Sequence, residues 1–334
     1  MKISVIGAGT WGACLSNLLA ENGHDVAIWG RNSQSINAME SSLKHPNLKN
    51  FTYSENIKFL TDINDALDSE ILVIAVATSS VRSVISKMES TNKLIKSKFV
   101  IASKGIENDT CFTISEILEN TLSIDRELIY VLSGPSHAEE VIQKHPTTVV
   151  IANSLISNAR EMQTIFSNKY FRVYSSDDLL GVQLGGSIKN VIAIAAGICS
   201  GMGYGDNALS ALTVRGLEEI SHLANKMGAK KTTVFGISGC GDLIATAFSK
   251  HSRNRFVGER LGNGESLDNI LVQMNMVAEG VNTTKSIQQL SVQNDIQMPI
   301  CNEIYNIIFN NKKPDEAIGD LMSRELVDEK IERN

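Results

Sequence analysis

A glycine-rich hexapeptide near the N-terminus constrains the fold of this chain more than any other feature. Residues 2–6, Lys-Ile-Ser-Val-Ile, have the composition of a buried strand, and the pattern Gly-x-Gly-x-x-Gly follows at once in residues 7–12. An amphipathic stretch, residues 14–22, comes next and closes with Gly23. A strand, a tight glycine turn and a helix in this order predict the first βαβ unit of a dinucleotide-binding domain.

Each glycine of the motif has a physical reason to be there. Gly7 permits the tight turn, Gly9 lets the backbone approach a pyrophosphate, and Gly12 lets the helix pack closely on the strand. A glycine-rich turn without a ligand is the plain alternative, but the position between strand and helix favours the nucleotide.

The end of the second predicted strand bears on the choice of nucleotide. Residues 28–32 read Ile-Trp-Gly-Arg-Asn and contain none of the carboxylates that NAD-selective sites use for the ribose 2′-hydroxyl. The guanidinium of Arg31 suits a 2′-phosphate instead, which predicts tolerance of NADP or preference for it. The alternative is that Arg31 is only a solvated surface charge.

Short Val/Ile-rich runs alternate with helical stretches through the first half of the chain, which indicates a doubly wound, mostly parallel sheet. We expect strands at residues 2–6, 25–29, 71–75, 99–102, 129–132, 147–151 and 171–174. From residue 177 onward the spacing is helical, with one possible strand at residues 233–237. The boundary falls near residues 176–186, so we expect an α/β domain at 1–180 and an all-helical domain at 181–334, without a flexible linker.

Bulk composition narrows the class of protein. The 334 residues are 43% apolar and 20% charged, with a net charge of −6 and a pI near 5.6, which argues against nucleic acid as a partner. Five scattered cysteines indicate neither disulfides nor a metal site. The strand pattern begins at residue 2, so we expect no signal peptide. The most apolar stretch, residues 191–198, is too short for a membrane span, and we expect a cytoplasmic protein.

Polar residues follow the predicted strands where ligands of open α/β sheets bind. Lys104 follows the fourth strand and could meet a phosphate or a substrate oxygen. Gly134 and Ser136 follow the fifth, at the start of a helix, where they offer backbone and hydroxyl donors. His137 is more typical of a surface residue and is assigned no role.

The helix expected at residues 178–200 has small residues at every fourth position and one lysine among them. Gly181, Gly185, Lys189, Ala193 and Gly197 share a slowly winding face. That face suits the close approach of a ligand to the Lys189 ammonium. It equally suits tight helix packing, with the lysine reaching out to solvent. Two further polar segments, residues 239–243 and 252–256, interrupt helical sequence, and their spacing does not show whether they meet Lys189.

With these residues the chain resembles, over essentially its whole length, the NAD(P)-dependent sn-glycerol-3-phosphate dehydrogenases of the bacterial biosynthetic type. The segments that carry the resemblance are residues 7–12, 103–105, 134–138, 186–191, 205–207 with 213–216, 239–243, 252–254 and 277–280. The lysine motif is specific to the family, whereas the nucleotide motif is not. Ser187-Ile188 replaces the usual Ala-Leu, and Asn32 stands where a second cationic or imidazole side chain often follows the arginine.

The resemblance implies a fold like that of 6-phosphogluconate dehydrogenase, NADP or NAD as cofactor, and interconversion of dihydroxyacetone phosphate and sn-glycerol 3-phosphate for phospholipid synthesis. It implies a catalytic role for Lys189 and a homodimer. Residues implied to bind the substrate are Lys104, Gly134, Ser136, Lys189, Asp242, Ser252, Arg253 and Asn254. Those implied to bind the cofactor are Gly7, Gly9, Thr10, Trp11, Gly12, Arg31, Lys104, Ala138, Arg253, Val277 and Glu279.

The residue types fit that chemistry. Charge builds on a ketone oxygen as hydride reaches its carbon, and an ammonium such as that of Lys189 stabilises the oxygen and protonates it. Asp242 would orient the lysine or a substrate hydroxyl, and Arg253 would hold the phosphate. A related two-domain reductase of another small keto acid or keto alcohol is the nearest alternative, although an unphosphorylated keto acid has little use for the Ser-Arg-Asn segment. A non-catalytic NADP(H) sensor is a second alternative, in which Lys189 would be dispensable.

Overall fold

The computed structural model describes residues 1–91, 96–274 and 278–329. The chain divides into two compact units. Unit 1 comprises Met1–Glu107 and Phe112–Gln183, and unit 2 comprises Asn108–Cys111 and Leu184–Asn334. The change from unit 1 to unit 2 therefore falls within a single helix, α7 (Leu179–Gly201).

Unit 1 is built on one eight-stranded sheet with the order β3-β2-β1-β4-β5-β6-β7-β8. The strands are β1 (Lys2–Ile6), β2 (Asp25–Trp29), β3 (Lys58–Leu60), β4 (Ile71–Ile74), β5 (Lys98–Ile101), β6 (Ile129–Ser133), β7 (Thr147–Ala152) and β8 (Phe171–Ser176). β6 and β7 pair antiparallel, and all other neighbours pair parallel. The predicted mostly parallel sheet is confirmed, and each of the strands predicted between residues 2 and 174 is present. β3 was missed because a three-residue edge strand is too short to show a period.

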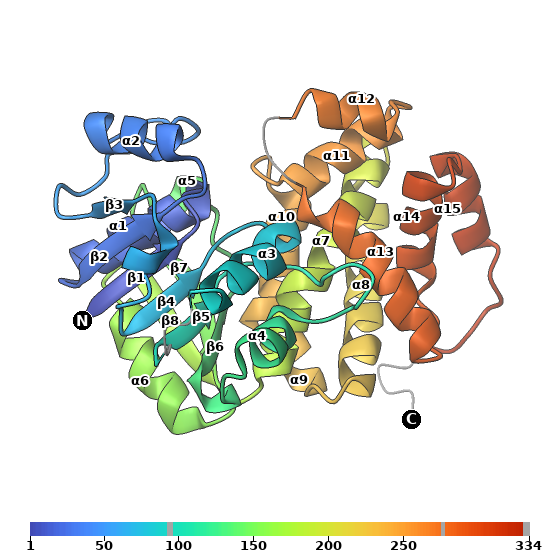
Figure 1. Cartoon of the computed structure of the whole chain (residues 1–334). Coiled ribbons are helices and arrows are strands. Elements are labelled where there is room, and N and C mark those ends of the chain that lie inside the picture. The colour runs from blue at the N-terminus through green and yellow to red at the C-terminus, as the bar shows by residue number, and fades with distance from the viewer. Residues whose placement is uncertain (92–95, 275–277, 330–334) are drawn as a thin grey trace. The chain divides into compact units, whose positions relative to one another are not determined.

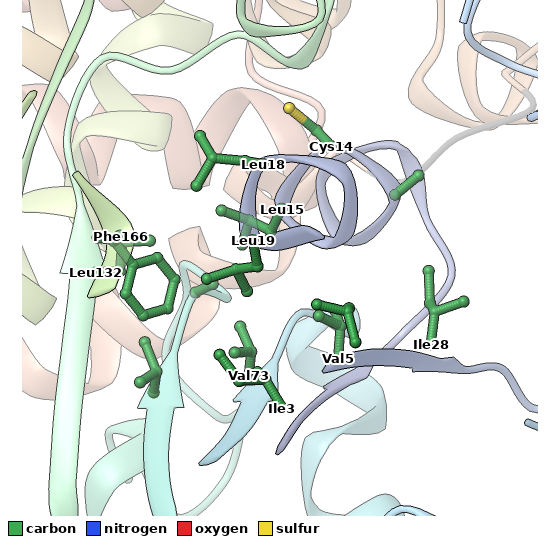
Figure 2. Packing of buried hydrophobic residues seen from close by; sticks show 14 of the residues in the cluster. Ile3, Val5, Cys14, Leu15, Leu18, Leu19, Ile28, Val73, Leu132 and Phe166 are labelled. Atoms are coloured by element: carbon green, nitrogen blue, oxygen red, sulfur yellow. The ribbon is translucent and has the colours of Figure 1, made fainter. Parts of the chain in front are cut away.

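Helices cover both faces of this sheet, as a doubly wound fold requires. On one face α1 (Thr10–Glu21) packs against α5 (Ala138–Val141) and α6 (Ile156–Phe166), and on the other α3 (Thr78–Glu89) packs against α4 (Ile114–Leu122) (Figure 1). Figure 2 shows Leu15 and Leu19 of α1 directed toward Ile3 and Val73 of the strands. Burying such a side chain stabilises the fold by about 1.5–3 kcal/mol.

The end of α1 explains a glycine outside the nucleotide motif. Gly23 has φ +86°, a conformation that side chains disfavour. The turn lets the His24 amide donate to the Leu19 carbonyl at 3.2 Å, which satisfies one of the last carbonyls of the helix. The chain can then enter β2 directly.

The register of the strands brings the candidate loops of unit 1 to one edge of the sheet. Ile6, the last residue of β1, pairs with Trp29 at the end of β2 and with Ile74 at the end of β4. Ile74 in turn pairs with Ile101 at the end of β5. The loops after all of these strands therefore leave from the carboxyl edge, where open α/β sheets bind ligands.

Unit 2 contains no strand among its described residues, in agreement with the predicted all-helical domain. Besides α7, its helices are α8 (Asp206–Lys226), α9 (Lys231–Val234), α10 (Asp242–Phe248), α11 (Arg253–Gly262), α12 (Leu267–Val272), α13 (Glu279–Gln293), α14 (Pro299–Phe309) and α15 (Pro314–Met322) (Figure 1). The possible strand at residues 233–237 is wrong. Val234 ends α9 and is fully buried, so packing overrides the β propensity of this Thr/Val segment.

Helix α7 is long and apolar enough to cross a membrane, but 94% of its apolar window is buried inside the protein. Residues 191–198 are only part of a longer apolar helix, so the prediction that the apolar stretch is too short for a membrane span is wrong. The burial of α7, and not its length, identifies it as a core helix. A Cβ on Gly197 would lie 2.8 Å from the Gly258 Cα of α11. Glycine is needed here because the two helix backbones approach closely.

Candidate active site

The three motif glycines of unit 1 differ in what surrounds them. Gly7 has φ +123°, and a Cβ there would lie 2.7 Å from the Ala75 carbonyl. A Cβ on Gly12 would collide with the Gly7 carbonyl oxygen, whereas one on Gly9 would meet nothing within 4 Å. The protein's own packing thus requires Gly7 and Gly12, while Gly9 keeps open a space beside the backbone.

The start of α1 has no side-chain cap from the described residues. Thr10 is its first residue, and Gly9 at the N-cap position provides no capping side chain. The first amides of such a helix are suited to an anion. Next to them the Trp11 indole Nε1 is buried without an acceptor among the described residues. Open space beside Gly9, the uncapped start of α1 and the buried Trp11 indole donor fit the phosphates of a dinucleotide.

The loop after β2 separates the roles of two neighbouring residues. Arg31 is exposed and forms no ion pair with the described part of the chain. Asn32 caps α2 (Ser33–Ser42), since its Oδ1 accepts a hydrogen bond from the Ser35 amide at 3.0 Å. Of the two residues, only Arg31 is a cation. Asn32, which replaces the second cationic or imidazole side chain of the family, caps α2 instead.

Lys104 and Ser136 meet at one carbonyl on the carboxyl edge of the sheet. Lys104 Nζ donates to the Gly134 carbonyl at 2.9 Å, and Ser136 Oγ donates to the same oxygen at 3.0 Å. Gly134 has φ +146°, and a Cβ there would lie 2.8 Å from the Val149 Cα. Ala138, buried, begins the short helix α5. The three predicted residues Lys104, Gly134 and Ser136 are thus in one hydrogen-bonded group.

Lys189 of α7 is buried in unit 2 and paired. Its Nζ lies 3.0 Å from Asp242 Oδ1 and donates to Thr246 Oγ1 at 2.5 Å. The Lys189 side chain is 7% exposed and that of Asp242 3%. Thr246, in turn, donates to the Asp242 carbonyl at 2.6 Å, one helical turn back along α10. The alternative of a lysine reaching out to solvent is therefore wrong.

A π-helical turn, Ile237–Gly241, delivers Asp242 to this lysine. The Gly241 amide donates to the Gly236 carbonyl at 3.1 Å, five residues back, which is the signature of a π turn. A Cβ on Gly185 of α7 would lie 3.1 Å from the Gly239 Cα. Gly185 and Gly197 of α7 do serve tight packing. The packing at Gly185 brings Asp242 beside Lys189, which lies one turn further along α7.

The second polar segment also reaches α7. Asn254 Nδ2 donates to Asn190 Oδ1 at 2.8 Å, and Asn254 Oδ1 accepts from the Gly280 amide at 2.9 Å. The Ser252 hydroxyl accepts from the Arg255 amide at 3.1 Å and so caps α11. Arg253 is the first residue of α11 and is exposed. Asn254 therefore anchors the segment to Asn190, the residue after Lys189, while Arg253 is exposed.

The remaining predicted residues belong to the start of α13. Glu279 is its first residue and is partly buried, and Val277 lies outside the described residues. Residues 108–111 contact the same helix, where Ser286 Oγ donates to Asn108 Oδ1 at 2.8 Å.

Among the described residues, no group of three or more His, Cys, Asp or Glu side chains could hold a metal ion.

Sequence reasoning missed two residues beside Lys189. Thr246 donates and accepts within the Lys189–Asp242 pair, and Asn190 connects α7 to α11. Thr246 lies four residues after Asp242, which is one turn of a helix, so a predicted helix beginning at Asp242 could have identified it. Nothing in the local sequence of Asn190 indicated its partner.

Comparison with known proteins shows which family the chain belongs to. The family model for the N-terminus of NAD-dependent glycerol-3-phosphate dehydrogenase matches residues 2–159, and the model for its C-terminus matches residues 178–319. The chain is 47% identical over 328 residues to the glycerol-3-phosphate dehydrogenase [NAD(P)+] of Staphylococcus saprophyticus, covering 97% of this chain and 98% of that protein.

Solved structures with the same fold include another glycerol-3-phosphate dehydrogenase. The crystal structure of glycerol-3-phosphate dehydrogenase from Coxiella burnetii matches with a TM-score of 0.91 and 30% identity, over 97% of this chain and 99% of that one. A PanE/ApbA family ketopantoate reductase from Ralstonia eutropha JMP134 shares only the fold, with a TM-score of 0.63 and 16% identity over 95% of this chain and 100% of that one. The chain belongs to the NAD-dependent glycerol-3-phosphate dehydrogenase family.

Proposed function

We propose specific roles for the residues of this glycerol-3-phosphate dehydrogenase, which interconverts dihydroxyacetone phosphate and sn-glycerol 3-phosphate. Residues 1–180 form the NAD(P)-binding domain and residues 181–334 the catalytic domain. The product feeds glycerophospholipid synthesis. The observation that carries the proposal is the buried Lys189 ammonium, which Asp242 and Thr246 hold in one orientation.

Lys189 is the catalytic residue. NAD(P)H, when bound, supplies the hydride for the ketone carbon of the substrate. The Lys189 ammonium donates a hydrogen bond to the ketone oxygen, stabilises the negative charge that builds there, and gives up the proton that completes the alcohol. In the reverse direction the neutral amine takes the proton from the hydroxyl group. Burial strengthens this effect, because the field of an ammonium is screened less inside a protein than in water.

Asp242 and Thr246 act by holding that ammonium. A lysine side chain has four rotatable bonds, and two hydrogen bonds at Nζ restrict it to few rotamers. The orientation is set before the substrate arrives, so less order has to be imposed during the reaction.

The substrate phosphate is bound at the start of α11. Arg253 is exposed at the first turn of this ten-residue helix, where the backbone amides favour an anion. Ser252 and Asn254 fix the position of the turn through their hydrogen bonds, and Lys104, Gly134 and Ser136 contribute further substrate contacts. Binding energy from a phosphate remote from the ketone can be used to position the reacting carbon.

The cofactor contacts are those of the glycine loop, with Thr10 and Trp11, together with Lys104, Ala138, Arg253, Val277 and Glu279. Arg31 binds the 2′-phosphate and gives a preference for NADPH over NADH. Its exposure and the absence of an ion pair with the described residues support this role. Titration of native protein and Arg31→Leu with both cofactors tests it. NADPH affinity should fall in the variant while NADH affinity stays the same, and equal losses would contradict the role.

The protein is proposed to be a cytoplasmic homodimer that assembles through the helical domain. Four apolar side chains of unit 2 that are 47–63% exposed support an interface: Val214, Phe235, Ile244 and Phe248. All five cysteines are free, as in a reducing compartment. Light scattering after gel filtration tests the dimer, and a monomer at micromolar concentration would contradict it.

A substrate comparison tests the proposed phosphate site. The native protein should reduce dihydroxyacetone phosphate far faster than dihydroxyacetone, because the latter lacks the phosphate that Arg253 binds. Arg253→Leu should remove most of that difference by raising KM for the phosphorylated substrate, whereas Arg126→Leu, a surface arginine of unit 1, should not. Equal use of both substrates by the native protein would favour a reductase of another keto compound.

A further inference from the structure

His45, in the segment after α2, contacts the glycine loop of unit 1 although it lies more than thirty residues away in sequence. Its imidazole Nε2 is 3.2 Å from the carbonyl oxygen of Ala8, the residue between the first two motif glycines. The residue is only 5% exposed, so it cannot serve as a flexible surface contact.

The ring is held from its other side by its own turn. The Asn47 amide donates to His45 Nδ1 at 3.1 Å, and the Leu48 amide donates to the His45 carbonyl at 3.2 Å. Leu48 is 4% exposed and belongs to the apolar core of unit 1, which anchors the turn. Because a backbone amide can only donate, Nδ1 carries the lone pair and Nε2 carries the hydrogen that is donated to Ala8.

The neutral form of the ring satisfies both contacts. Burial lowers the pKa of His45 below its usual value, although the hydrogen bond to Ala8 opposes this shift. A neutral ring with hydrogen on Nε2 is therefore the form that the surroundings favour at neutral pH.

Holding the Ala8 carbonyl has a consequence for the next amide. In a trans peptide the carbonyl and the following N–H point in opposite directions, so a fixed Ala8 carbonyl fixes the direction of the Gly9 N–H. The structure contains no cis peptide bond among its described residues. The Gly9 N–H therefore points away from His45. Without the hydrogen bond from His45, the Ala8–Gly9 peptide plane could rotate more freely, because glycine restricts the backbone least.

We propose that His45 is a positioning residue for the cofactor, which sets the Ala8–Gly9 peptide plane so that the Gly9 amide donates to the pyrophosphate. The inference rests on the proposed placement of the pyrophosphate at the glycine loop. His45 itself does not touch the cofactor and acts only through Ala8.

Calorimetric titration of three variants tests the role. His45→Leu keeps the volume and removes the donor, and His45→Gln keeps an N–H donor. His24→Ala is the matched control, because His24 Nε2 makes a similar contact, 3.3 Å from the Ile165 carbonyl, at the other end of α1. Since a lost hydrogen bond is worth about 1 kcal/mol, the NADPH Kd should rise about five- to tenfold in His45→Leu. It should stay within about twofold in the other two variants, as should kcat at saturating NADPH in all three.

Fragments of the cofactor identify where the loss arises. The weakening in His45→Leu should recur with 2′-phospho-ADP-ribose, which contains the pyrophosphate, and should be absent with adenosine 2′-monophosphate, which does not. Equal weakening for both fragments, or an equal loss in His24→Ala, would overturn the role. If the native protein failed to bind 2′-phospho-ADP-ribose, the placement of the pyrophosphate itself would be wrong. If His45→Leu bound this fragment as tightly as the native protein, the placement would stand and only the role of His45 would be wrong.

The native protein provides a test that needs no variant. Nitrogen-15 chemical shifts of the His45 ring should show a neutral imidazole with hydrogen on Nε2, in the free protein and with 2′-phospho-ADP-ribose bound. Hydrogen on Nδ1 would exclude donation to Ala8 and overturn the inference even if His45→Leu failed to fold.

Discussion

Lys189 Nζ and Asp242 Oδ1 lie 3.0 Å apart in an ion pair whose side chains are 7% and 3% exposed. Burial removes two charges from water at a cost of several kcal/mol, which mutual attraction and further hydrogen bonds must offset. Thr246 supplies such a hydrogen bond at 2.5 Å from Nζ. The pair therefore places a charged, oriented ammonium in the interior of unit 2, where its effect on a nearby oxygen is strongest.

Removing one partner of this pair should be costly. Asp242→Leu leaves a buried ammonium beside an apolar side chain, and we expect the free energy of unfolding in urea to fall by about 3–5 kcal/mol. The double variant Lys189→Met/Asp242→Leu should recover most of this stability and remain inactive.

An exposed ion pair serves as the matched control for that experiment. Lys58 and Asp25 are 2.9 Å apart with side chains 62% and 49% exposed. Asp25→Leu should therefore change the free energy of unfolding by no more than about 1 kcal/mol. A loss of stability in Asp242→Leu no larger than that would contradict the account of the buried pair.

Thr246 should affect turnover more than binding. Thr246→Val removes the hydroxyl that accepts from Lys189 but keeps the shape of the side chain, so the ammonium gains rotational freedom. We expect kcat to fall about tenfold while KM for NADPH stays the same, and Thr246→Ser to restore kcat. Steady-state kinetics measure this. A kcat for Thr246→Val equal to that of the native protein would mean that Asp242 alone orients the lysine.

The sequence predicts most of the sheet because its central strands are buried on both faces and therefore read as continuous apolar runs. Residues 71–74, Ile-Leu-Val-Ile, are an example in which all four side chains are buried. Elements that depend on distant contacts were not predictable. β3 exists because it pairs with β2, and residues 231–234 form a helix because Val234 is buried in unit 2.

The candidate site was predictable in its residue types but not in its partners. The spacing of Gly181, Gly185 and Lys189 gave a shared helix face, but it could not show that Gly185 packs on the Gly239 backbone and so brings Asp242 to the lysine. The sequence likewise gave no sign that the Asn254 amide is hydrogen-bonded to Asn190 and Gly280. Such long-range pairs are set by tertiary packing, which no local pattern contains.

The glycine loop allows folding and cofactor binding to be separated. Gly9→Ala adds a methyl group that meets nothing within 4 Å, so the free energy of unfolding should change by less than about 0.5 kcal/mol. The NADPH Kd should nevertheless rise at least about tenfold, because the methyl group occupies the space where backbone meets pyrophosphate. Gly12→Ala should instead destabilise the fold, since its Cβ collides with the Gly7 carbonyl. Unaltered NADPH binding by Gly9→Ala would place the cofactor elsewhere.

Stability should depend on the ionisation of Glu219, a buried residue of α8. Its carboxylate accepts from the Ile300 and Cys301 amides at the start of α14, at 2.7 and 3.1 Å. Burial raises the pKa of Glu219 from 4.5 to about 7, although these two amides oppose the shift. The folded state binds the proton more tightly than the unfolded state, so this contribution is fully present below pH 4.5 and is lost as pH rises through about 7.

Glu219→Gln should remove that dependence. Relative to the native protein, the variant should gain roughly 3 kcal/mol of unfolding free energy between pH 4.5 and pH 8, because glutamine resembles the protonated acid at every pH. Urea unfolding of both proteins at several pH values measures the difference. A difference that stays constant with pH would show that Glu219 keeps an ordinary pKa in the folded protein.

The role of Lys189 is tested most directly by the rate of NADPH oxidation with dihydroxyacetone phosphate, in the native protein, in Lys189→Met and in Lys98→Met. Lys98 is a matched control because its ion pair with Glu161 lies at the surface of unit 1. We predict rapid turnover in the native protein and in Lys98→Met, and a fall in kcat of at least about a thousandfold in Lys189→Met with NADPH binding retained. Turnover by Lys189→Met within tenfold of the native rate, at the same NADPH affinity, would contradict the catalytic role of Lys189.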